Sequence, residues 1–387
     1  MAVPITYNIR NLVQRKGTTL MTAFGIALTV AVLVASMALT AGLRDVFAGS
    51  GDPRHVLVLR KGVNAELTST VTTENYQIIR RMPGIATAPD GEPMVSPEGL
   101  TVVNLPSVDS PDGMNVTVRG MLPIGLTMRK VDILQGKMFE PGLRQIIVGE
   151  SVARRYPDAR IGKKLRFGRG WWEVVGVFKV GDSAANSEMW VDLNQLRGDF
   201  EQQGGSSSLL IRTQSDAAQA NLAKMVADDQ RLGSAVMGEK EYYAAMTLSG
   251  APLEALGFAV AVIMAIGSAF AATNTMYAAV ARRTREIGTL RALGFGRWSI
   301  LWSFMLESVC LALLGGILGV LIALPINGLT TGVGSFVTFS EVAFKFRIGP
   351  LAILLGLTFA AVIGAIGGFL PAWSASKKDV VSAMREI

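Results

Sequence analysis

Long apolar segments without charged residues dominate the pattern of this 387-residue chain. Segments 17–43 and 255–281 each contain 27 uncharged residues, and segment 348–376 contains 29. A fourth apolar segment, 298–326, is interrupted only by Glu307. Because a helix of about 20 apolar residues crosses the hydrocarbon core of a bilayer, the pattern predicts four transmembrane helices. A long region of mixed polarity separates the first predicted span from the second.

The first apolar segment has a competing interpretation as a cleaved signal peptide. Its uncharged run is longer than the 7–15 residues that are usual for the core of a signal peptide, and no clear small-residue cleavage site follows. We therefore predict that segment 17–43 is retained as a span.

Basic residues indicate the orientation of the spans. They are concentrated in the N-terminal tail 1–16, in segment 282–297 and in the C-terminal tail, whereas the short 327–347 connection has few. Lysine and arginine in short loops mark the cytoplasmic side of a membrane. Both termini and segment 282–297 are therefore predicted to be cytoplasmic, and region 44–253 to lie outside.

The charge distribution excludes a nucleic-acid surface. Region 44–253 has 24 basic and 24 acidic residues, and the 13 basic and 6 acidic residues elsewhere account for the net charge of +7. This surplus flanks the spans, where topology explains it, so we predict no nucleic-acid partner.

Few residues have the chemistry of a catalytic or metal site. The chain has one histidine, His55, and one cysteine, Cys310 in an apolar run, which excludes a multi-histidine metal site and an internal disulfide. Ser151 lacks the G-x-S-x-G context of a hydrolase and is predicted to cap a short helix. GKK at 162–164 lacks the glycine and hydroxyl residues of a phosphate-binding loop. The chain is therefore predicted not to be an enzyme and to bind no cofactor itself.

The outside region 44–253 alternates between strand and helix patterns. Residues 55–62 read as a strand and 72–84 as a helix, and the order repeats at 207–213 and 215–232. Between these units, short strand-like runs such as WWEVVGVFKV are separated by Gly, Pro and Asp turns. We predict an α/β part that is interrupted by a mostly β insertion.

The stretch RRTREIGTLRALGFGR (282–297) is both basic and amphipathic. Ile287, Leu290 and Leu293 recur at a spacing of three and would form an apolar edge on a short helix. Gly294 and Gly296 are predicted to end that helix in left-handed turns. An orientation signal alone would explain the arginines but not the apolar edge, which favours a docking surface for a partner.

The third predicted span contains small residues and one ionisable residue that indicate contacts with other helices. Gly315, Gly316 and Gly319 would allow close helix packing, either within this chain or between two copies. Glu307 is the one ionisable residue well inside a predicted span, and either a hydrogen bond to a neighbouring span or a relay role fits it.

Three stretches, in order along the chain, resemble MacB/FtsX/LolC-type ABC transporter permeases. They are ITYNIRNLVQRKGTTLMTAFGIALTVAVLV (5–34), GKMFEPGLRQIIVGESVARRYPDARIGKKLRFGRGWWEVVGVFK (136–179), and RRTREIGTLRALGFGRWSI (282–300) together with LLGGILG (313–319) and LPAWSASKKDVVSAMRE (370–386). The chain departs from that pattern at Asp379, where the family commonly has a proline.

The resemblance implies a membrane α-helical fold with four spans and a large extracytoplasmic α+β domain, in the inner membrane of a bacterium. The expected layout is a cytoplasmic amphipathic segment 1–16, spans 17–43, 254–281, 298–326 and 348–373, a coupling helix 282–297, a short outer loop 327–347 and a cytoplasmic tail 374–387. Within the outer domain 44–253, the family implies a porter-like part (51–100 and 207–246) and a sabre-like part (101–206).

The resemblance also implies partners and site residues. The coupling helix would dock on a separate ATP-binding subunit, present in two copies, through Arg285, Glu286, Ile287, Leu290, Arg291, Leu293 and Gly294. A second cytoplasmic contact would use Val380, Val381, Met384 and Arg385. ATP and Mg²⁺ would be bound by that subunit. A second permease copy, identical or similar, and an adaptor, outer-membrane or lipoprotein partner would complete the assembly.

The function implied is efflux or extraction of a peptide, drug, lipid or lipoprotein, driven by movement of the outer domain (mechanotransmission). An FtsX-like regulator that activates cell-wall hydrolases is the alternative. A receptor or adhesion protein that needs no ATPase is a third hypothesis, and it predicts no role for segment 282–297.

Overall fold

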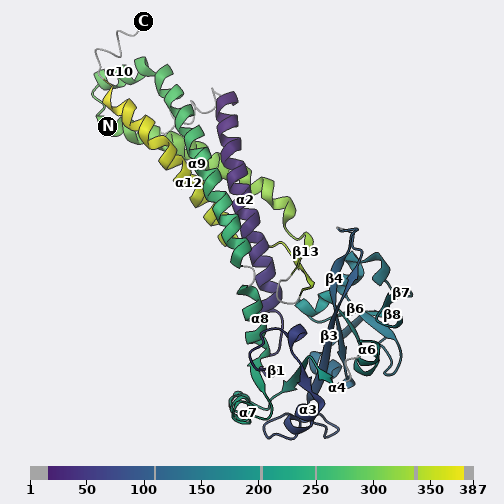
Figure 1. The fold of residues 1–387 in the computed structure, drawn as a ribbon. Helices are drawn as coiled ribbons and strands as arrows, with labels where there is room; N and C mark the ends of the chain where they lie inside the picture. The colour runs from purple at the N-terminus through teal and green to yellow at the C-terminus, as the bar shows by residue number, and fades with distance from the viewer. Residues whose placement is uncertain (1–15, 109, 201–203, 249–250, 335–338, 379–387) are drawn as a thin grey trace. The chain divides into compact units, whose positions relative to one another are not determined.

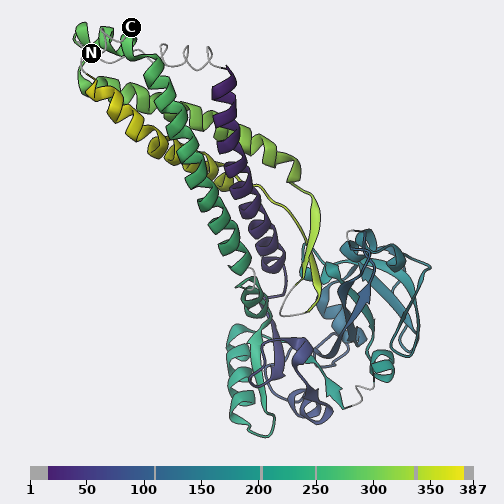
Figure 2. The same cartoon turned by 45° about the horizontal axis from the view of Figure 1, so that its top comes forward.

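The computed structural model describes residues 16–108, 110–200, 204–248, 251–334 and 339–378. It divides into two compact units. One contains the apolar helices (residues up to 42, 251–329 and from 345), and the other contains 43–250 and 330–344; we call them the membrane unit and the extramembrane domain. Figure 1 and Figure 2 show the elements of both.

Four helices of the described chain are long and apolar enough to cross a membrane. They are α2 (Lys16–Ala48), α9 (Ala251–Arg282), α11 (Arg297–Ala323) and α12 (Pro350–Lys377), as Figure 1 shows. The short α10 (Thr284–Ala292) lies between α9 and α11, and a 3₁₀ turn, η4 (Leu324–Ile326), follows α11. The four predicted spans are therefore present as helices.

Glycines allow the helices of the membrane unit to pack closely. A Cβ atom at Gly315 or Gly319 would lie 2.7 or 2.5 Å from a backbone carbonyl of α2, and one at Gly316 would lie 2.8 Å from Ala360 of α12. Two hydroxyl pairs, Thr22–Thr275 and Thr29–Ser268, join α2 and α9 at 2.8 Å. Small residues and interhelical hydrogen bonds replace the hydrophobic effect as the basis of packing among lipid tails. In this conformation, the three predicted glycines serve packing within the chain.

The extramembrane domain is built on one ten-stranded sheet in the order β12-β1-β11-β3-β4-β9-β6-β8-β5, with β7 paired to β8. Its strands are β1 (His55–Arg60), β3 (Val95–Leu105), β4 (Met114–Met121), β5 (Asp132–Gly136), β6 (Gln145–Gly149), β7 (Lys164–Phe167), β8 (Gly170–Lys179), β9 (Glu188–Asp192), β11 (Ser208–Arg212) and β12 (Ser234–Gly238). A separate two-stranded sheet joins β2 (Val71–Thr72) and β10 (Gly205–Ser206).

Strand β3 connects the two predicted parts of the domain. Its first half, Val95–Glu98, pairs with β11, and its second half, Gly99–Leu105, pairs with β4. Residues 51–100 and 207–246 (the α/β part) therefore share one continuous sheet with residues 101–206 (the insertion). The sequence predicted these parts as separate subdomains and did not predict that one strand would serve both.

Short helices accompany the sheet. They are η1 (Glu66–Thr68), α3 (Thr73–Ile79), α4 (Pro123–Arg129), α5 (Glu150–Arg155), η2 (Pro157–Ala159), η3 (Ala184–Ser187), α6 (Leu193–Phe200), α7 (Asp216–Asp228) and α8 (Glu239–Leu248). Ser215 caps α7 by accepting a hydrogen bond from the N–H of Ala218, as its position in the sequence predicts. The predicted cap at Ser151 is wrong: α5 begins at Glu150, so Ser151 lies in its first turn and the N-cap is Gly149.

The predicted short loop 327–347 is largely a β-hairpin. Strands β13 (Thr330–Gly334) and β14 (Glu341–Lys345) pair with each other, and residues 330–344 belong to the extramembrane domain. Strand β14 is mostly buried. The segment is too short and irregular for periodicity to reveal two strands.

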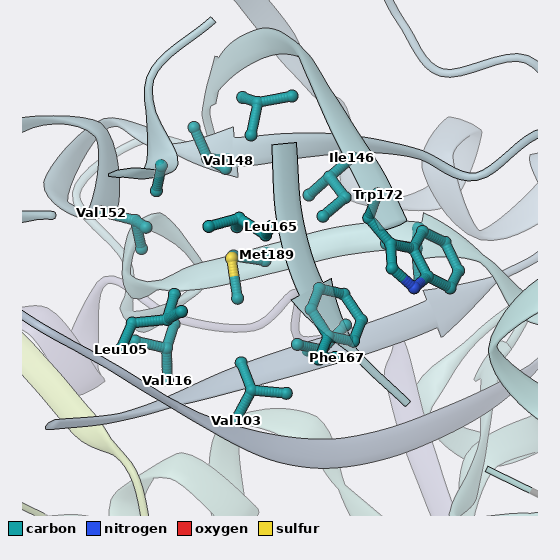
Figure 3. Packing of buried hydrophobic residues seen from close by; sticks show 14 of the residues in the cluster. Val103, Leu105, Val116, Ile146, Val148, Val152, Leu165, Phe167, Trp172 and Met189 are labelled. Atoms are coloured by element: carbon teal, nitrogen blue, oxygen red, sulfur yellow. The ribbon is translucent and has the colours of Figure 1, made fainter. Parts of the chain in front are cut away.

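Alternating side chains of the insertion form its main core. Val116 and Val118 of β4, Ile146 and Val148 of β6, and Trp172 of β8 are all buried in one cluster. Figure 3 shows Phe167 beside Trp172, and their rings stack with centroids 5.2 Å apart. The Trp172 indole N–H also donates to the buried Asp199 carboxylate at 3.0 Å.

Adjacent tryptophans allow a matched test of this core. Trp172→Ala removes a fully buried side chain, so we expect a loss of about 3–5 kcal/mol in the free energy of unfolding. Trp171→Ala removes a side chain that is 59% exposed, and we expect a change within about 0.5 kcal/mol. Denaturant unfolding of the full chain in detergent measures both. Equal losses would contradict the described packing.

Candidate functional site

The site region centres on α10, whose ends are fixed by specific contacts. At its C-terminus, Gly294 has φ +94°. The Gly294 N–H donates to the Arg291 carbonyl, and the Phe295 N–H donates to the Leu290 carbonyl, each at 3.1 Å. This pair of bonds around a left-handed glycine is a Schellman motif. The prediction for Gly294 is confirmed, whereas the one for Gly296 is wrong: Gly296 has φ −70° and precedes α11.

The inner face of α10 packs against three spans. Ile287 is 1% exposed and belongs to a buried cluster with Met276, Val280, Ile300, Leu301, Phe304, Ala372 and Ala375, from α9, α11 and α12. Leu290 is half-buried and Leu293 is 68% exposed. The predicted apolar edge is therefore divided. Its first residue faces the chain's own helices and only its last is fully available at the surface.

The outer face of α10 carries charge beside an apolar residue. Arg285, Glu286, Thr289 and Leu293 are exposed, and they recur with helical spacing. Arg291, one of the predicted docking residues, is half-buried and makes contacts within the chain. Its Nη1 donates to the Lys378 carbonyl at 2.8 Å and to the Ser376 carbonyl at 3.4 Å, so it satisfies carbonyl groups at the end of α12.

A buried ion pair ties the start of α10 to the third span. Arg283 Nη1 lies 2.9 Å from Glu307 Oε2, and the two residues are 4% and 5% exposed. Glu307 thus has a hydrogen-bonding partner, but Arg283 lies between α9 and α10 and not in a neighbouring span, where the sequence hypothesis placed the partner. The sequence did not single out Arg283 among the five arginines of 282–297. A carboxylate inside a span, such as Glu307, requires a cation nearby, and this requirement could have pointed to Arg283.

Residues 379–387 lie outside the described structure, and with them the predicted second contact at Val380, Val381, Met384 and Arg385. The last described residue, Lys378, donates from Nζ to the hydroxyl of Thr284 at 3.1 Å. Together with Arg291, this contact joins α10 to the C-terminal end of α12.

A second polar cluster, which sequence reasoning missed, lies inside the extramembrane domain. All five N–H groups of Arg119 donate to carboxylates of Glu66, Glu98 and Glu188, at 2.7–3.2 Å. Burial alone would lower the pKa of the Arg119 guanidinium, but the charges of Glu188, Glu66 and Glu98 outweigh burial and raise it well above the ordinary value. Arg119 is therefore a fully hydrogen-bonded cation.

Arg129 extends this cluster to α8. Its guanidinium donates to Glu98 at 2.8 Å and to Glu239 at 3.2 Å, and Glu239 also accepts a hydrogen bond from His55 Nδ1 at 3.0 Å. Burial raises the pKa of Glu239, but the His55 hydrogen bond and the charge of Arg129 outweigh it and hold that pKa at about 2. His55 is thus a structural partner of Glu239. We call Glu66, Glu98, Arg119, Arg129, Glu188 and Glu239 the Arg119 network.

The extramembrane domain also has cavities on its surface. Two open cavities of about 470 and 300 Å³ lie on the extramembrane domain, the first lined by residues including Glu150, Arg154 and Ile161, the second by residues including Asp52, His55 and Lys130. Among the described residues, no group of three or more His, Cys, Asp or Glu side chains is placed to hold a metal.

Two family models together match most of the chain. The FtsX-like permease C-terminal model matches residues 258–380, and the MacB-like periplasmic core domain model matches residues 19–228. The chain belongs to the MacB-like family of ABC transporter permeases. The resemblance that the sequence predicted is confirmed, as is the fold class of four membrane helices with a large extramembrane α+β domain.

Relatives of this MacB-like permease include two curated proteins. It is 25% identical over 325 residues to the macrolide export ATP-binding/permease protein MacB of Agrobacterium fabrum, covering 75% of this chain and 49% of the relative. It is 28% identical over 287 residues to an uncharacterized ABC transporter permease, YknZ, of Bacillus subtilis, covering 70% of each chain. The alignment thus spans about half the length of the first relative.

Solved structures of extramembrane domains are also similar. The periplasmic region of MacB from Actinobacillus actinomycetemcomitans matches with a TM-score of 0.37 and 12% identity, over 49% of this chain and 91% of that one. The extracellular domain of YknZ matches with a TM-score of 0.36 and 18% identity, over 48% of this chain and 100% of that one. The family models and the four apolar helices fit an inner-membrane protein with an extracytoplasmic domain.

The Arg283–Glu307 pair predicts a non-additive pattern of stability. Arg283→Met or Glu307→Leu removes one member of the buried ion pair, which typically costs about 3–5 kcal/mol. The double variant Arg283→Met/Glu307→Leu removes both charges, and we expect its stability to lie within about 1 kcal/mol of the original chain. Thermal unfolding in detergent measures the cycle. Additive losses would contradict a direct interaction.

Glu239 predicts a dependence of stability on pH. Because its pKa is about 2 in the folded chain, below the ordinary value of 4.5, ionised Glu239 stabilises the fold above about pH 4.5. This contribution, about 3 kcal/mol, is lost as the pH falls from 4.5 through 2. Unfolding of the original chain and of Glu239→Gln is compared between pH 2 and 7, with the exposed Glu92→Gln as control. An unchanged pH dependence in Glu239→Gln would refute the assignment.

Proposed function

We propose that this chain is the transmembrane subunit of an ABC complex in which a separate ATP-binding subunit drives movement of the extramembrane domain. The observation that carries the proposal is the construction of α10. Its inner face is buried against α9, α11 and α12, and its outer face is left exposed. A firmly held helix whose exposed face carries charged and apolar residues can bind a partner and transmit that partner's movement to the spans.

The contacts of α10 make it a mechanical junction. Arg283 attaches it to α11 through Glu307, and Arg291 attaches it to the end of α12. A displacement of α10 would therefore move α11 and α12 with it, since breaking the buried Arg283–Glu307 ion pair or the Arg291 hydrogen bonds would cost free energy. The surface offered to the ATP-binding subunit is Arg285, Glu286, Thr289 and Leu293, with half-buried Leu290 beside it.

Other parts of the proposal follow from this role. The complex would contain two copies of the ATP-binding subunit and a second permease chain, identical or similar, with α10 and both termini in the cytoplasm. ATP and Mg²⁺ would be held by the ATP-binding subunits, and this chain would be non-catalytic. The work would be efflux or extraction of a peptide, drug, lipid or lipoprotein outside the membrane, with an adaptor, outer-membrane or lipoprotein partner.

A signalling role like that of FtsX-type regulators is the second candidate. The large extramembrane domain, with its continuous ten-stranded sheet, favours transport or extraction as the work of this chain. Companions that purify with the chain distinguish the two, because a cell-wall hydrolase would point to signalling.

A double substitution on the outer face of α10 tests the coupling proposal. Glu286→Lys with Leu293→Asp reverses one charge and places another on the apolar position. We expect it to reduce recovery of the ATP-binding subunit in a pull-down at least about tenfold, which corresponds to about 1.4 kcal/mol. The control makes the same kinds of change on the extramembrane domain, at exposed Glu92 (to Lys) and Val108 (to Asp). Equal recovery with both variants would exclude α10 as the docking surface.

A further inference from the structure

The β13–β14 hairpin is inserted into the extramembrane domain as a structural part of it. The Thr117 hydroxyl of β4 donates to the Ser340 hydroxyl at 2.7 Å, and the Ala343 N–H donates to the Ser187 hydroxyl at 2.9 Å. Phe344 is 2% exposed. The hairpin comes from the chain between α11 and α12, yet its polar partners Thr117 and Ser187 belong to the insertion.

A buried carboxylate makes this docking specific. Glu341 is 5% exposed, forms an ion pair with Arg155, and accepts a hydrogen bond from the Tyr156 hydroxyl. A Cβ atom built on Gly332 of β13 would overlap both Glu341 and Arg155. A buried carboxylate costs several kcal/mol when it loses its partners, so a hairpin that left this position would have to break the Glu341–Arg155 ion pair.

Segments that lead to every span meet near this docking site. A cavity of about 30 Å³, room for about one water, is lined by Phe47 at the end of α2, Tyr242 of α8, Glu341 of the hairpin, and Arg119. Helix α8 leads to α9, and the hairpin lies between α11 and α12. The Arg119 network lies at the same place and is bonded to both the α/β part and the insertion.

We propose that the docked hairpin is a second attachment through which α11 and α12 control the extramembrane domain, in addition to the attachment through α2 and α8. This inference rests on the proposed function. The continuous sheet and the Arg119 network make the domain a rigid body. A rigid body held at one attachment can swing, but one held at two must follow any displacement of α11 and α12 against α2 and α9. The alternative is that the hairpin only fills a hydrophobic surface.

Two glycines of the same strand provide a matched test of docking. Gly332→Ala collides with the Glu341–Arg155 pair, whereas a Cβ at Gly334 meets no atom within 4 Å. Hydrogen exchange of the full chain in detergent is followed by mass spectrometry. We expect Gly332→Ala to speed exchange at least about tenfold in β14 and around Tyr156, with β1 and β11 unchanged, and Gly334→Ala to match the original.

Glu341→Gln serves as a second, milder variant in case Gly332→Ala destabilises the whole domain. It keeps the shape of the side chain and removes its charge, so it removes the Glu341–Arg155 ion pair. Faster exchange confined to the same two segments supports docking. Exchange like that of the original chain in both variants overturns it.

The transmission step is tested in the assembled complex. Spin labels are placed at exposed Lys164 of β7 and Leu256 of α9 in a Cys310→Ser chain, and distances are measured before and after trapping the ATP-binding subunit with nucleotide and vanadate. We expect a discrete shift in the original chain and Gly334→Ala. In Gly332→Ala we expect a broadened distribution and no shift, with trapping retained.

The outcomes separate the two proposals. A full shift in an undocked Gly332→Ala variant overturns transmission through the hairpin, as does the absence of a shift in the original complex. Failure of the ATP-binding subunit to bind the original chain counts against the proposed function. The exchange result on the isolated chain still decides docking in that case.

Discussion

The extramembrane domain depends on burying one arginine among carboxylates. Arg119 is 2% exposed and uses every N–H group on Glu66, Glu98 and Glu188, which come from a 3₁₀ turn, β3 and β9. Such a cluster stabilises the fold only when complete, because each unpartnered buried charge costs several kcal/mol. The α/β part and the insertion must therefore keep their mutual arrangement. Through Arg129 and Glu239 the same requirement extends to α8, which leads into the second span.

The membrane unit satisfies a comparable constraint with fewer charges. Backbones approach closely at Gly315, Gly319 and Gly364, and hydroxyl groups such as Ser308 donate across helices. The Arg283–Glu307 pair lies where α9 turns into α10. It therefore fixes the start of the exposed helix α10 to α11. A short helix held this firmly can transmit a displacement instead of absorbing it.

Sequence reasoning predicted the elements that depend on local pattern and missed those that depend on distant partners. The four spans, the helix capped by Ser215 and the left-handed Gly294 follow from hydropathy and turn chemistry, and all are present. The partners Arg119–Glu66 and Arg283–Glu307 are 53 and 24 residues apart, and only the tertiary fold selects them from many charges. The spacing of three predicts that Ile287 belongs to the docking edge. Such spacing shows that residues share a helix face, but it does not show whether that face contacts a partner or the chain's own helices. The pattern of 327–347 predicts only a short outer loop, because the hairpin within it is buried by the insertion, far away in the sequence.

Coupling requires that the outer face of α10 contacts an ATP-binding subunit. A photo-crosslinking residue placed at Leu293, which is 68% exposed, tests it most directly in native membranes. The same residue at buried Ile287 is the control. We expect a crosslinked product that contains an ATP-binding protein from position 293 and none from position 287. Crosslinks from position 293 to lipid alone, or to other proteins without any ATP-binding subunit, would contradict it.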